Sequence, residues 1–424
     1  HVLPPRPVCA DGPMTERIEQ IEVGLRGDRR LADDTPLPES DTRLVAHIRD
    51  EIGARGPMTF ARFMELALYD PDAGYYATGA GGPGRAGDFL TAPEAHPIFG
   101  WAIARRLEQA WDQLSRPDPF VVREHGSGAG GLAVGILGGL RRAGSPLLDA
   151  IRYQPIDISA AARAAFSAAV EAAGVAAHVV PPDDRLGPGA VIANELLDAL
   201  PVHLVEGGPS GNLLERFVGI GPAGGLAAIA APPSTPALAA RLAAEGIALQ
   251  PGQRAEVCLE IDTWLAAAVA PLERGLVIVV DYGQPADQLY APGRGSTLRA
   301  YHRHRVHDDP LVAIGRQDLT AHVDLTALER AGAAAGLAVL RRTTQAEYLA
   351  DLGLGELLVG LQSGPDASFE AYLAARSAVV RLLDPRATGR FAVIELGRGL
   401  PPLAGGAART GRAVLAAARE GRSR

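Results

Sequence analysis

The 424-residue sequence contains no lysine, because all 41 of its basic residues are arginine. A protein without lysine cannot form a Schiff base with pyridoxal phosphate or with a carbonyl substrate, and it has no P-loop lysine to hold a nucleotide phosphate. Asparagine is nearly absent as well, occurring only at Asn194 and Asn212. Glycine and proline are abundant, with 50 and 33 residues. Glycine-rich motifs therefore arise easily in this chain, and each needs support from other residue types.

Cysteine is also scarce, and Cys9 and Cys258 are too few for a disulfide framework or a cysteine-based metal site. We expect both to be ordinary thiols in a reducing cytoplasm. The net charge of -8 leaves no basic surplus to displace the counterions of a nucleic acid. The uncharged run 128–140 is shorter than the roughly 20 residues that span a bilayer. We therefore predict a cytoplasmic protein without nucleic-acid or membrane partners.

Changes in composition and periodicity divide the chain into parts. Residues 1–40 carry arginines but also many acids, unlike a transit peptide, and we interpret them as a loosely ordered extension. Asp41 or Thr42 is placed to cap a first helix, and Thr59 a second. The expected organisation then comprises an N-terminal helical or lid segment at 41–118, an α/β domain at 119–200 and 271–400, an insertion at 201–270 and a C-terminal tail at 401–424.

The α/β domain is predicted from strand patterns that alternate with helix patterns. Such βαβ series build a mostly parallel sheet, and the fully apolar run 276–280 is typical of a central strand. Two strands around the last helices are expected to close the sheet in antiparallel fashion. Within the insertion, 204–206 and 213–220 look like antiparallel strands. The strands expected in the main sheet are 120–122, 151–158, 177–180, 191–193, 276–280, 337–342 and 391–396.

A glycine loop lies between a predicted strand and a predicted helix, with the sequence Glu124-His125-Gly126-Ser127-Gly128-Ala129-Gly130-Gly131. Its glycines let the chain turn tightly and let a ligand approach the backbone and the helix N-terminus. The loop fits two patterns. Gly126, Gly128 and Gly131 match the dinucleotide pattern, whereas Gly126, Gly128 and Gly130 match the pattern of S-adenosylmethionine enzymes.

Polar residues at the ends of neighbouring strands favour the second pattern. Glu124 precedes the glycines, where an anion suits a ligand with an amino group and a sulfonium better than it suits a pyrophosphate. Asp157 ends the second strand, where it can bind ribose hydroxyls in either case. Asn194 and Glu195 follow the fourth strand at the carboxyl edge, where open α/β sheets bind ligands. Glu195 and Asp198 are three residues apart and are expected to share one face of a helix.

Several further runs are long, ordered and not simply rich in glycine. They are 60–68 with Gly74-Tyr75-Tyr76, 87–94 with Phe99-Gly100, 193–203, Asp281-Tyr282-Gly283, Thr297-Leu298 and 318–324. With Glu124 and the glycine loop, these runs make the chain resemble the MidA-like family of S-adenosylmethionine-dependent methyltransferases. The resemblance extends over residues 42–397, which is most of the chain.

This resemblance implies a Rossmann-like class I methyltransferase. The implied α/β fold has a seven-stranded, mostly parallel sheet, an N-terminal helical segment and an inserted β-containing subdomain. The implied activity is methyl transfer from S-adenosyl-L-methionine, suspected to go to an arginine side chain of a protein. Because mitochondrial members are complex I assembly factors, the protein partner expected by analogy is a subunit of a respiratory complex. The sequence does not indicate an oligomeric state.

The resemblance and the strand-end residues together name a candidate site. The residues expected to bind the cofactor are Glu124, Gly126, Gly128, Gly130, Asp157 and Asn194. An arginine acceptor also needs a carboxylate that orients the guanidinium and takes its proton, since its pKa is too high for easy deprotonation in water. The candidate catalytic carboxylates are Asp88, Glu94, Glu195 and Asp198, of which the first two lie in an aromatic loop expected to close over the site.

Aromatic residues and histidines in the same runs are the candidate substrate contacts. They are Tyr76, Phe89, His203, Tyr282 and His322. For His322, capping or core hydrogen bonding is an alternative role. The cluster His302, His304, His307, Asp308 and Asp309 matches no zinc spacing and has no cysteine beside it, so we predict no metal site.

The chain departs from the pattern of the family at four positions. His96 stands where serine is usual, Ser127 replaces proline, Ala129 replaces a larger residue and Asp157 replaces glutamate. Ribose binding tolerates the last change. The other changes keep open an assembly or binding protein on a methyltransferase fold with little or no catalysis. A nucleotide-dependent oxidoreductase is a second alternative, although the acids at the strand ends argue against it.

Overall fold

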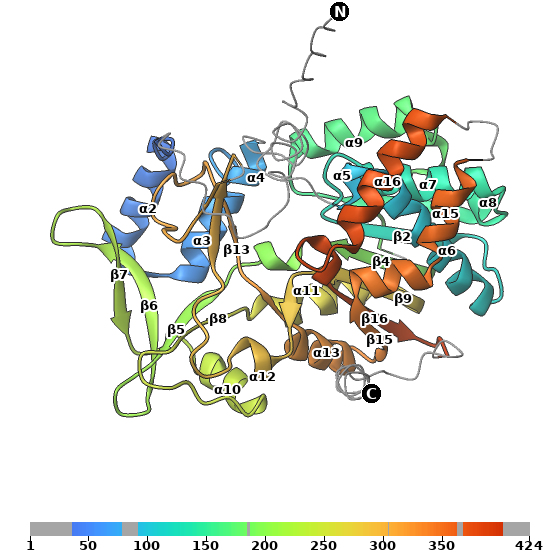
Figure 1. Cartoon of the computed structure of the whole chain (residues 1–424). Helices are drawn as coiled ribbons and strands as arrows, with labels where there is room; N and C mark the ends of the chain where they lie inside the picture. The colour runs from blue at the N-terminus through green and yellow to red at the C-terminus, as the bar shows by residue number, and fades with distance from the viewer. Residues whose placement is uncertain (1–35, 79–91, 185–186, 304, 363–367, 402–424) are drawn as a thin grey trace, which may run out of the picture.

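A central sheet organises most of the computed structural model, which describes residues 36–78, 92–184, 187–303, 305–362 and 368–401 (Figure 1). The strand order of this sheet is β15-β16-β9-β4-β2-β3. The strands span β2 (Phe120–His125), β3 (Ile151–Ile156), β4 (Gly187–Asn194), β9 (Leu272–Asp281), β15 (Ala338–Thr344) and β16 (Ala392–Arg398).

The directions of these strands follow the predicted pattern. β3, β2, β4 and β9 are parallel to one another, whereas β16 is antiparallel to both β9 and β15. β15 therefore runs in the same direction as the four parallel strands, and β16 alone is reversed. The antiparallel closing pair predicted from the sequence is confirmed.

The sheet has six strands among the described residues, rather than the seven that the resemblance implied. The segment 177–180, predicted as a strand, overlaps the 3-10 helix η2 (Ala176–His178) and meets the sheet through a single parallel bridge between Tyr153 and Val179. Pro181 and Pro182 follow directly. Proline has no N–H group for a ladder, so pairing cannot continue at these two positions.

Helices cover both faces of the sheet, and the alternation of strand side chains divides the core between them (Figure 1). In β9, Ile278 packs into one hydrophobic cluster while Val277 and Val279 pack into another, as expected for a strand buried on both faces. The helices of the first cluster include α6 (Ile98–Gln113), α7 (Gly131–Ala143), α9 (Ala160–Ala172), α14 (Gln345–Asp351), α15 (Leu354–Gly360) and α16 (Phe369–Leu383). Those of the second are α11 (Glu260–Val269) and α13 (Leu325–Ala334).

The N-terminal segment begins with two helices whose caps match the sequence pattern. The side chain of Asp41 accepts hydrogen bonds from the backbone N–H groups of the first turn of α2 (Thr42–Arg55). The Thr59 hydroxyl caps α3 (Phe60–Tyr69) in the same way. Of the two residues that the sequence offered as the cap of the first helix, Asp41 is the cap, and Thr42 is the first residue of the helix.

A second, antiparallel sheet joins this N-terminal segment to the insertion (Figure 1). Its order is β1-β6-β5-β8, with β7 paired to the other side of β6. The short strand β1 comes from the N-terminal segment and pairs with the insertion strand β6, Met58 opposite Val218. The elements are β1 (Met58–Thr59), β5 (His203–Gly207), β6 (Leu213–Ile220), β7 (Leu226–Ala231), β8 (Arg254–Val257) and the helix α10 (Pro236–Ala244). Two parts that are distant in sequence therefore form one layer.

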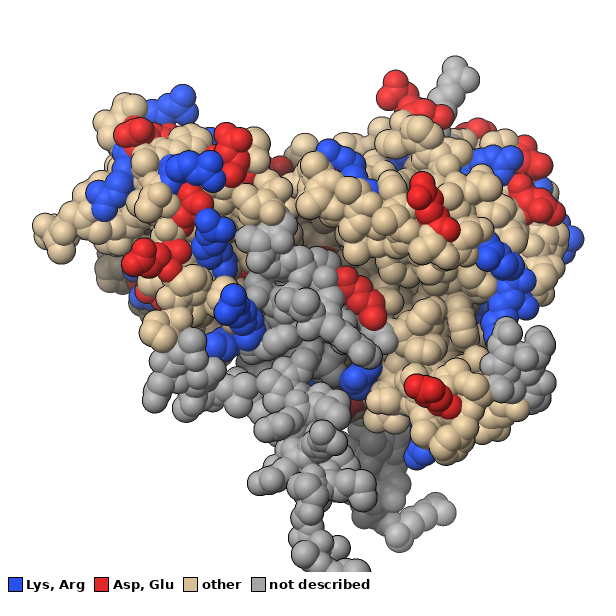
Figure 2. Space-filling model, turned by 90° about the horizontal axis from the view of Figure 1, so that it is seen from above, with Lys and Arg blue, Asp and Glu red and all other residues tan. Residues whose placement is uncertain are grey.

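The described surface carries both signs of charge. In the view from above, acidic and basic side chains are interspersed over the described residues instead of being separated by sign (Figure 2). Within the described ranges, no helix combines the length and apolar character that crossing a bilayer requires.

A buried ion pair ties the N-terminal half of the core to the last strand. Arg106 of α6 and Glu395 of β16 both have fully buried side chains. The Nε and Nη2 atoms of Arg106 donate to the two carboxylate oxygens of Glu395 at 2.7 and 3.1 Å. The Tyr348 hydroxyl of α14 donates to the same carboxylate at 2.7 Å. Both charges are therefore held in bidentate geometry, which compensates their removal from water.

Glu395→Gln is expected to lower the free energy of unfolding by about 3 kcal/mol or more, because it leaves the buried Arg106 without a counter-charge. The matched control is Asp112→Asn, which neutralises a partner of Arg116 in an exposed pair. This control should cost less than about 1 kcal/mol. Urea unfolding followed by circular dichroism measures both, and losses of equal size would contradict a structural role for the buried pair.

Candidate functional site

Polar side chains meet at the carboxyl edge of the main sheet, where four neighbouring parallel strands end. β2 ends with Glu124 and His125, Asp157 follows β3, β4 ends at Asn194 and β9 ends at Asp281. The chain passes from β2 to β3 on one side of it, and then from β3 to β4 on the other side of β2, so the direction of winding reverses between β2 and β4. Open α/β sheets bind ligands at such a switch point. The strand-end residues predicted to bind the cofactor therefore share one edge.

The glycine loop turns the chain from β2 into α7 at this switch point. Gly126, Gly128 and Gly130 have φ angles of 71°, 51° and 85°, the left-handed region that favours glycine. A Cβ atom on Gly126 would also lie 3.0 Å from the side chain of Leu196. The loop thus requires glycine both for its backbone conformation and for its close approach to the segment after β4.

Asp157 fastens the glycine loop to the end of β3. One carboxylate oxygen accepts the backbone N–H of Gly128 at 2.9 Å, and the other accepts that of Ser159 at 2.8 Å. The next residue, Ile158, exposes 60% of its surface. An acid and an exposed apolar side chain therefore stand side by side at this strand end, a combination that suits a sugar carrying a flat aromatic ring.

Glu124 is the buried acid of the loop and is only 3% exposed. Its carboxyl group accepts a hydrogen bond from the Tyr153 hydroxyl at 2.7 Å. Burial raises the pKa of Glu124 to about 8, although the hydrogen bond from Tyr153 opposes the rise. In the free protein this carboxyl is therefore largely neutral near pH 7, and an arriving cation favours its ionised form.

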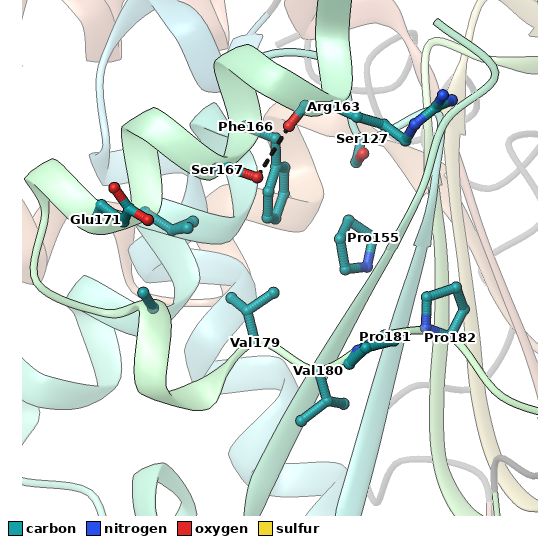
Figure 3. A pocket seen from close by; sticks show the side chains of 12 residues that line it. Ser127, Pro155, Arg163, Phe166, Ser167, Glu171, Val179, Val180, Pro181 and Pro182 are labelled. Carbon is teal, nitrogen blue, oxygen red and sulfur yellow. Dashed lines mark hydrogen bonds between the residues drawn. The ribbon is translucent and has the colours of Figure 1, made fainter. Parts of the chain in front are cut away.

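Three buried polar atoms at the same edge have no hydrogen-bond partner among the described residues. They are the Nε2 atom of His125, the hydroxyl oxygen of Ser127 and the side-chain oxygen of Asn194. Buried polar atoms are almost always paired, so unpartnered atoms in and beside the glycine loop indicate a place for a ligand. Ser127 also borders a cavity of about 340 Å³ between α9 and the segment 176–182. Figure 3 shows the Phe166 ring and several prolines and valines around this largely apolar space.

Glu195 does not share a helix face with Asp198, which corrects the expectation from their spacing. Glu195 has a φ of 51°, so the chain turns sharply at the end of β4, and the short 3-10 helix η3 (Leu197–Ala199) begins two residues later. The Glu195 carboxylate accepts the backbone N–H of Ala92 at 3.3 Å. A left-handed conformation in a residue other than glycine is strained and is often found at functional sites.

Asp281 sets the shape of this turn. One of its carboxylate oxygens accepts the backbone N–H groups of Leu196, Leu197 and Asp198, at 3.1, 2.8 and 3.3 Å. The other accepts the N–H of Tyr282 at 2.7 Å. Burial and the neighbouring charge of Asp198 raise the pKa of Asp281, while the backbone donors oppose the rise. This buried carboxylate therefore fixes the ends of β4 and β9 relative to each other.

A second cavity, of about 470 Å³, opens beside this turn. Three of the residues proposed from the sequence line it, namely Asp198, Tyr282 and His322. Asp198 is only 2% exposed. The rings of Tyr282 and His322 stack with their centroids 6.1 Å apart, because β10 (Gly283–Gln284) runs parallel to β14 (Val323–Asp324) directly beside them. A buried carboxylate and an aromatic wall thus face one space.

The remaining candidate residues lie elsewhere. The Tyr76 hydroxyl donates to Asp318 at 2.7 Å, and the Nδ1 atom of His203 lies 2.7 Å from a carboxylate oxygen of Glu215. Neither Tyr76 nor His203 lines the second cavity. Glu94 belongs to the short helix α5 (Ala92–Ala95), beside the N-terminus of α7. Asp88 and Phe89, and with them most of the expected lid, lie outside the described residues.

One member of the histidine-rich segment, His302, has a partner within the protein. The Nδ1 atom of His302 lies 2.8 Å from the carbonyl oxygen of Arg316, and burial lowers the pKa of His307. His304 lies outside the described residues. Over the parts of the chain that the structure describes, no three His, Cys, Asp or Glu side chains gather in a way that would hold a metal ion.

The sequence matches a known family over more than half of its length. The family is described as "Putative S-adenosyl-L-methionine-dependent methyltransferase", and the match covers residues 102–343. This chain belongs to that family. The matched range contains the glycine loop, the turn after β4 and most of the lining of the second cavity.

Solved and curated relatives of the methyltransferase extend the comparison. A crystal structure from Burkholderia thailandensis bound to S-adenosyl-homocysteine has a TM-score of 0.77 and 35% identity, covering 86% of this chain and 96% of that chain. A native structure from the same organism has a TM-score of 0.75 and 34% identity, with the same coverage. The human protein arginine methyltransferase NDUFAF7, a mitochondrial protein, is 28% identical over 363 residues, covering 78% of this chain and 77% of its own length.

These comparisons make the chain a methyltransferase that uses S-adenosyl-L-methionine, on a methyltransferase-like α/β fold. The strand-end residues fit such a ligand. Glu124 offers an anion for its amino group or sulfonium, Asp157 is placed for ribose hydroxyls, and the exposed Ile158 suits an adenine ring. The role of each residue in holding the cofactor stays a prediction.

Two kinds of residue at the site were not named as candidates from the sequence. Asp281 ends an apolar strand just as Glu124 and Asn194 end theirs, so the same strand-end rule identifies it. The cavity arginines Arg294, Arg299 and Arg390 have no such signal, because they come from irregular or short elements and are indistinguishable among 41 arginines.

Binding of S-adenosylmethionine should tighten as the pH rises toward about 8, because Glu124 must ionise to pair with a cation and its pKa in the free protein is about 8. At a pH of about 6.5, below the α-amino pKa of 7.7–8.0, the amino group of the ligand is already protonated and takes up no proton. Binding should therefore release close to one proton, which comes from Glu124. Calorimetry in two buffers of different ionisation enthalpy measures this release. Glu124→Gln, which keeps an acceptor for Tyr153, should remove both effects, and a wild-type proton balance near zero would refute the assignment.

Gly126→Ala is expected to weaken binding of S-adenosylmethionine at least about tenfold, because alanine is strained at this positive φ and its methyl group presses on Leu196. Gly138→Ala in α7 adds the same methyl group where nothing lies within 4 Å. That control should keep full affinity and stabilise the helix by about 0.5–1 kcal/mol. Calorimetry and thermal unfolding report the two quantities separately. Equal affinity in the two variants would show that the loop conformation is not needed.

Proposed function

We propose that this methyltransferase transfers the methyl group of S-adenosylmethionine to an arginine side chain of a protein. The observation that carries the proposal is the buried carboxylate of Asp198, which lines the second cavity four residues after Asn194 at the cofactor edge. The names of the curated relatives support the substrate class, since the human and Drosophila melanogaster proteins are both called protein arginine methyltransferases.

The lining of the second cavity suits a planar cation. Asp198 offers carboxylate oxygens to the N–H groups of a guanidinium, the strongest kind of hydrogen bond for that group. The side-chain oxygen of Gln284 is buried on the same lining and has no partner among the described residues, so it can accept a further N–H. The rings of Tyr282 and Tyr301 also line the cavity, and aromatic faces attract an arginine side chain.

The residues of the cavity also account for the proton that the reaction must remove. Bound S-adenosylmethionine supplies a methyl group on a sulfonium, which departs as a neutral thioether. The acceptor nitrogen that gains the methyl carbon has to lose a proton. Asp198 is the carboxylate on the lining of the cavity, and the chain has no lysine to serve instead. We assign the orientation of the guanidinium and the removal of its proton to Asp198.

The departures from the family pattern do not damage the site where the structure describes them. His96 replaces a serine, and its Nδ1 atom accepts the backbone N–H of Ile98, the first residue of α6, at 3.1 Å. Ser127 lies in an intact glycine loop, where Gly130 N–H bonds to its carbonyl oxygen. These contacts favour a catalytic protein over a purely binding one, which remains the second candidate.

The partner and the location are further predictions for this chain. A protein substrate agrees with the names of the relatives, whereas a respiratory-complex subunit as the target remains an expectation from the resemblance. The curated relatives are named mitochondrial, and the cytoplasmic location of this chain remains a prediction.

Asp198→Asn should lower the rate of methyl transfer to arginine at least about 100-fold while leaving S-adenosylmethionine binding nearly unchanged, because it removes the base but keeps the shape of the side chain. The assay uses tritiated S-adenosylmethionine, arginine-containing peptides and mass spectrometry for methylarginine. It must also score the 41 arginines of the enzyme itself. The exposed Asp112→Asn is the control. A wild-type protein that binds the cofactor but methylates no arginine would support the binding-protein alternative.

A further inference from the structure

The second cavity has a gradient of charge from its interior to its mouth. Asp198 on its lining is 2% exposed, so it lies deep. Three arginines, Arg294, Arg299 and Arg390, also line the cavity, and each is partly or fully exposed. The cavity therefore combines an acidic interior with a basic mouth. The three arginines at the mouth all carry the same sign of charge, whereas acidic and basic side chains are mixed on the face seen from above (Figure 2).

The basic mouth is only partly neutralised by the protein itself. Arg299 lies 3.7 Å from a carboxylate oxygen of Asp308 and donates to two backbone carbonyl oxygens. Arg294 donates to the carbonyl oxygen of Gln288 at 3.3 Å. In the part of the chain that the structure describes, neither Arg294 nor Arg390 has a carboxylate partner. No carboxylate of the described residues therefore offsets the charge of these two guanidinium groups, and both can attract an anionic group of a substrate.

An arginine substrate that enters this mouth experiences both electrostatic attraction and electrostatic repulsion. Its target guanidinium is attracted by Asp198 but must pass groups of its own charge, and two unit charges 4 Å apart repel by about 1 kcal/mol even in water. A substrate segment that carries carboxylates beside the target arginine removes the conflict. Those carboxylates pair with the mouth, in the bidentate geometry that arginine favours, while the target enters the acidic interior.

We propose that this methyltransferase selects arginines flanked by aspartate or glutamate, with Arg294 and Arg390 as the residues that read the flanking acids. The inference rests on the proposed function, since it takes arginine as the acceptor. It adds a sequence preference that neither the family nor the relatives' names describe. It also gives the mouth arginines a role in binding substrate, distinct from the chemistry at Asp198.

Three synthetic peptides test the preference. Each carries one arginine, flanked by glutamates, by serines or by lysines, and methyl transfer is measured with tritiated S-adenosylmethionine. The acid-flanked peptide should exceed the serine peptide about tenfold in kcat/KM, chiefly through KM, and the lysine peptide should be the poorest. The advantage should shrink as salt is raised from about 0.05 to 0.5 M, because the mouth is open to solvent.

Variants of the mouth assign the effect to residues. Arg390→Ala and Arg294→Ala should each reduce the ratio of acid-flanked to serine-flanked kcat/KM about three- to tenfold, and Arg390→Glu should move the preference toward the lysine peptide. Arg386→Ala is the matched control, since Arg386 lies four residues from Arg390, outside the lining, and pairs with Asp384. This control should keep the wild-type ratio. Melting temperatures establish that each variant is folded.

The outcomes separate the two proposals. Equal transfer to all three peptides overturns the flanking-acid preference and leaves arginine methylation standing. A preference that survives both alanine variants unchanged overturns the role of Arg294 and Arg390. If the protein binds S-adenosylmethionine but methylates none of the peptides at arginine, the proposed function and this inference fall together.

Discussion

The buried carboxylate of Asp281 is the constraint on which both halves of the site depend. It receives backbone N–H groups from 196–198 and from Tyr282, so it joins the turn after β4 to the end of β9. On one side this turn carries Asn194 and the cofactor edge. On the other it presents Asp198 to the second cavity. Because the next residues form β10 and pair with β14, the same contact also aligns Tyr282 with His322. A neutral side chain at this position would leave several buried N–H groups without a full acceptor.

Local pattern in the sequence was enough to predict that the candidate cofactor residues share one edge of the sheet. Acids and an amide at strand ends are visible in the sequence because each follows an apolar run, and parallel strands bring such ends to one edge by geometry alone. Glu124, Asp157 and Asn194 were identified in this way, and the structure adds Asp281 by the same rule. The mostly parallel direction of the strands also follows from alternating βαβ units, and the antiparallel contacts of β16 follow from the expected closing pair.

Long-range pairing accounts for what the sequence did not reveal. The sequence around Met58 does not predict that this residue pairs with Val218, which lies 160 positions later in the chain. The N-terminal segment and the insertion were therefore treated as separate parts. The arginines at the mouth of the cavity come from segments almost 100 residues apart, and their meeting depends on the tertiary fold. Glu195 was expected in a helix because its spacing to Asp198 allows one. The donors held by Asp281 impose a sharper turn that no local propensity encodes.

The position of β16 bears on how the protein can be made. This strand is the last of the sheet in sequence, yet it lies between β9 and β15, and its Glu395 neutralises an arginine that was synthesised almost 300 residues earlier. Until the ribosome has released β16, the growing chain presents the open edge of β9 and an uncompensated charge at Arg106. Exposed edges and unfinished cores are the places where nascent chains associate wrongly. The cofactor edge is complete in sequence at Asp281, but its supporting sheet closes only once β16 has been made, so an unfinished enzyme persists over the part of synthesis that lies between these two strands.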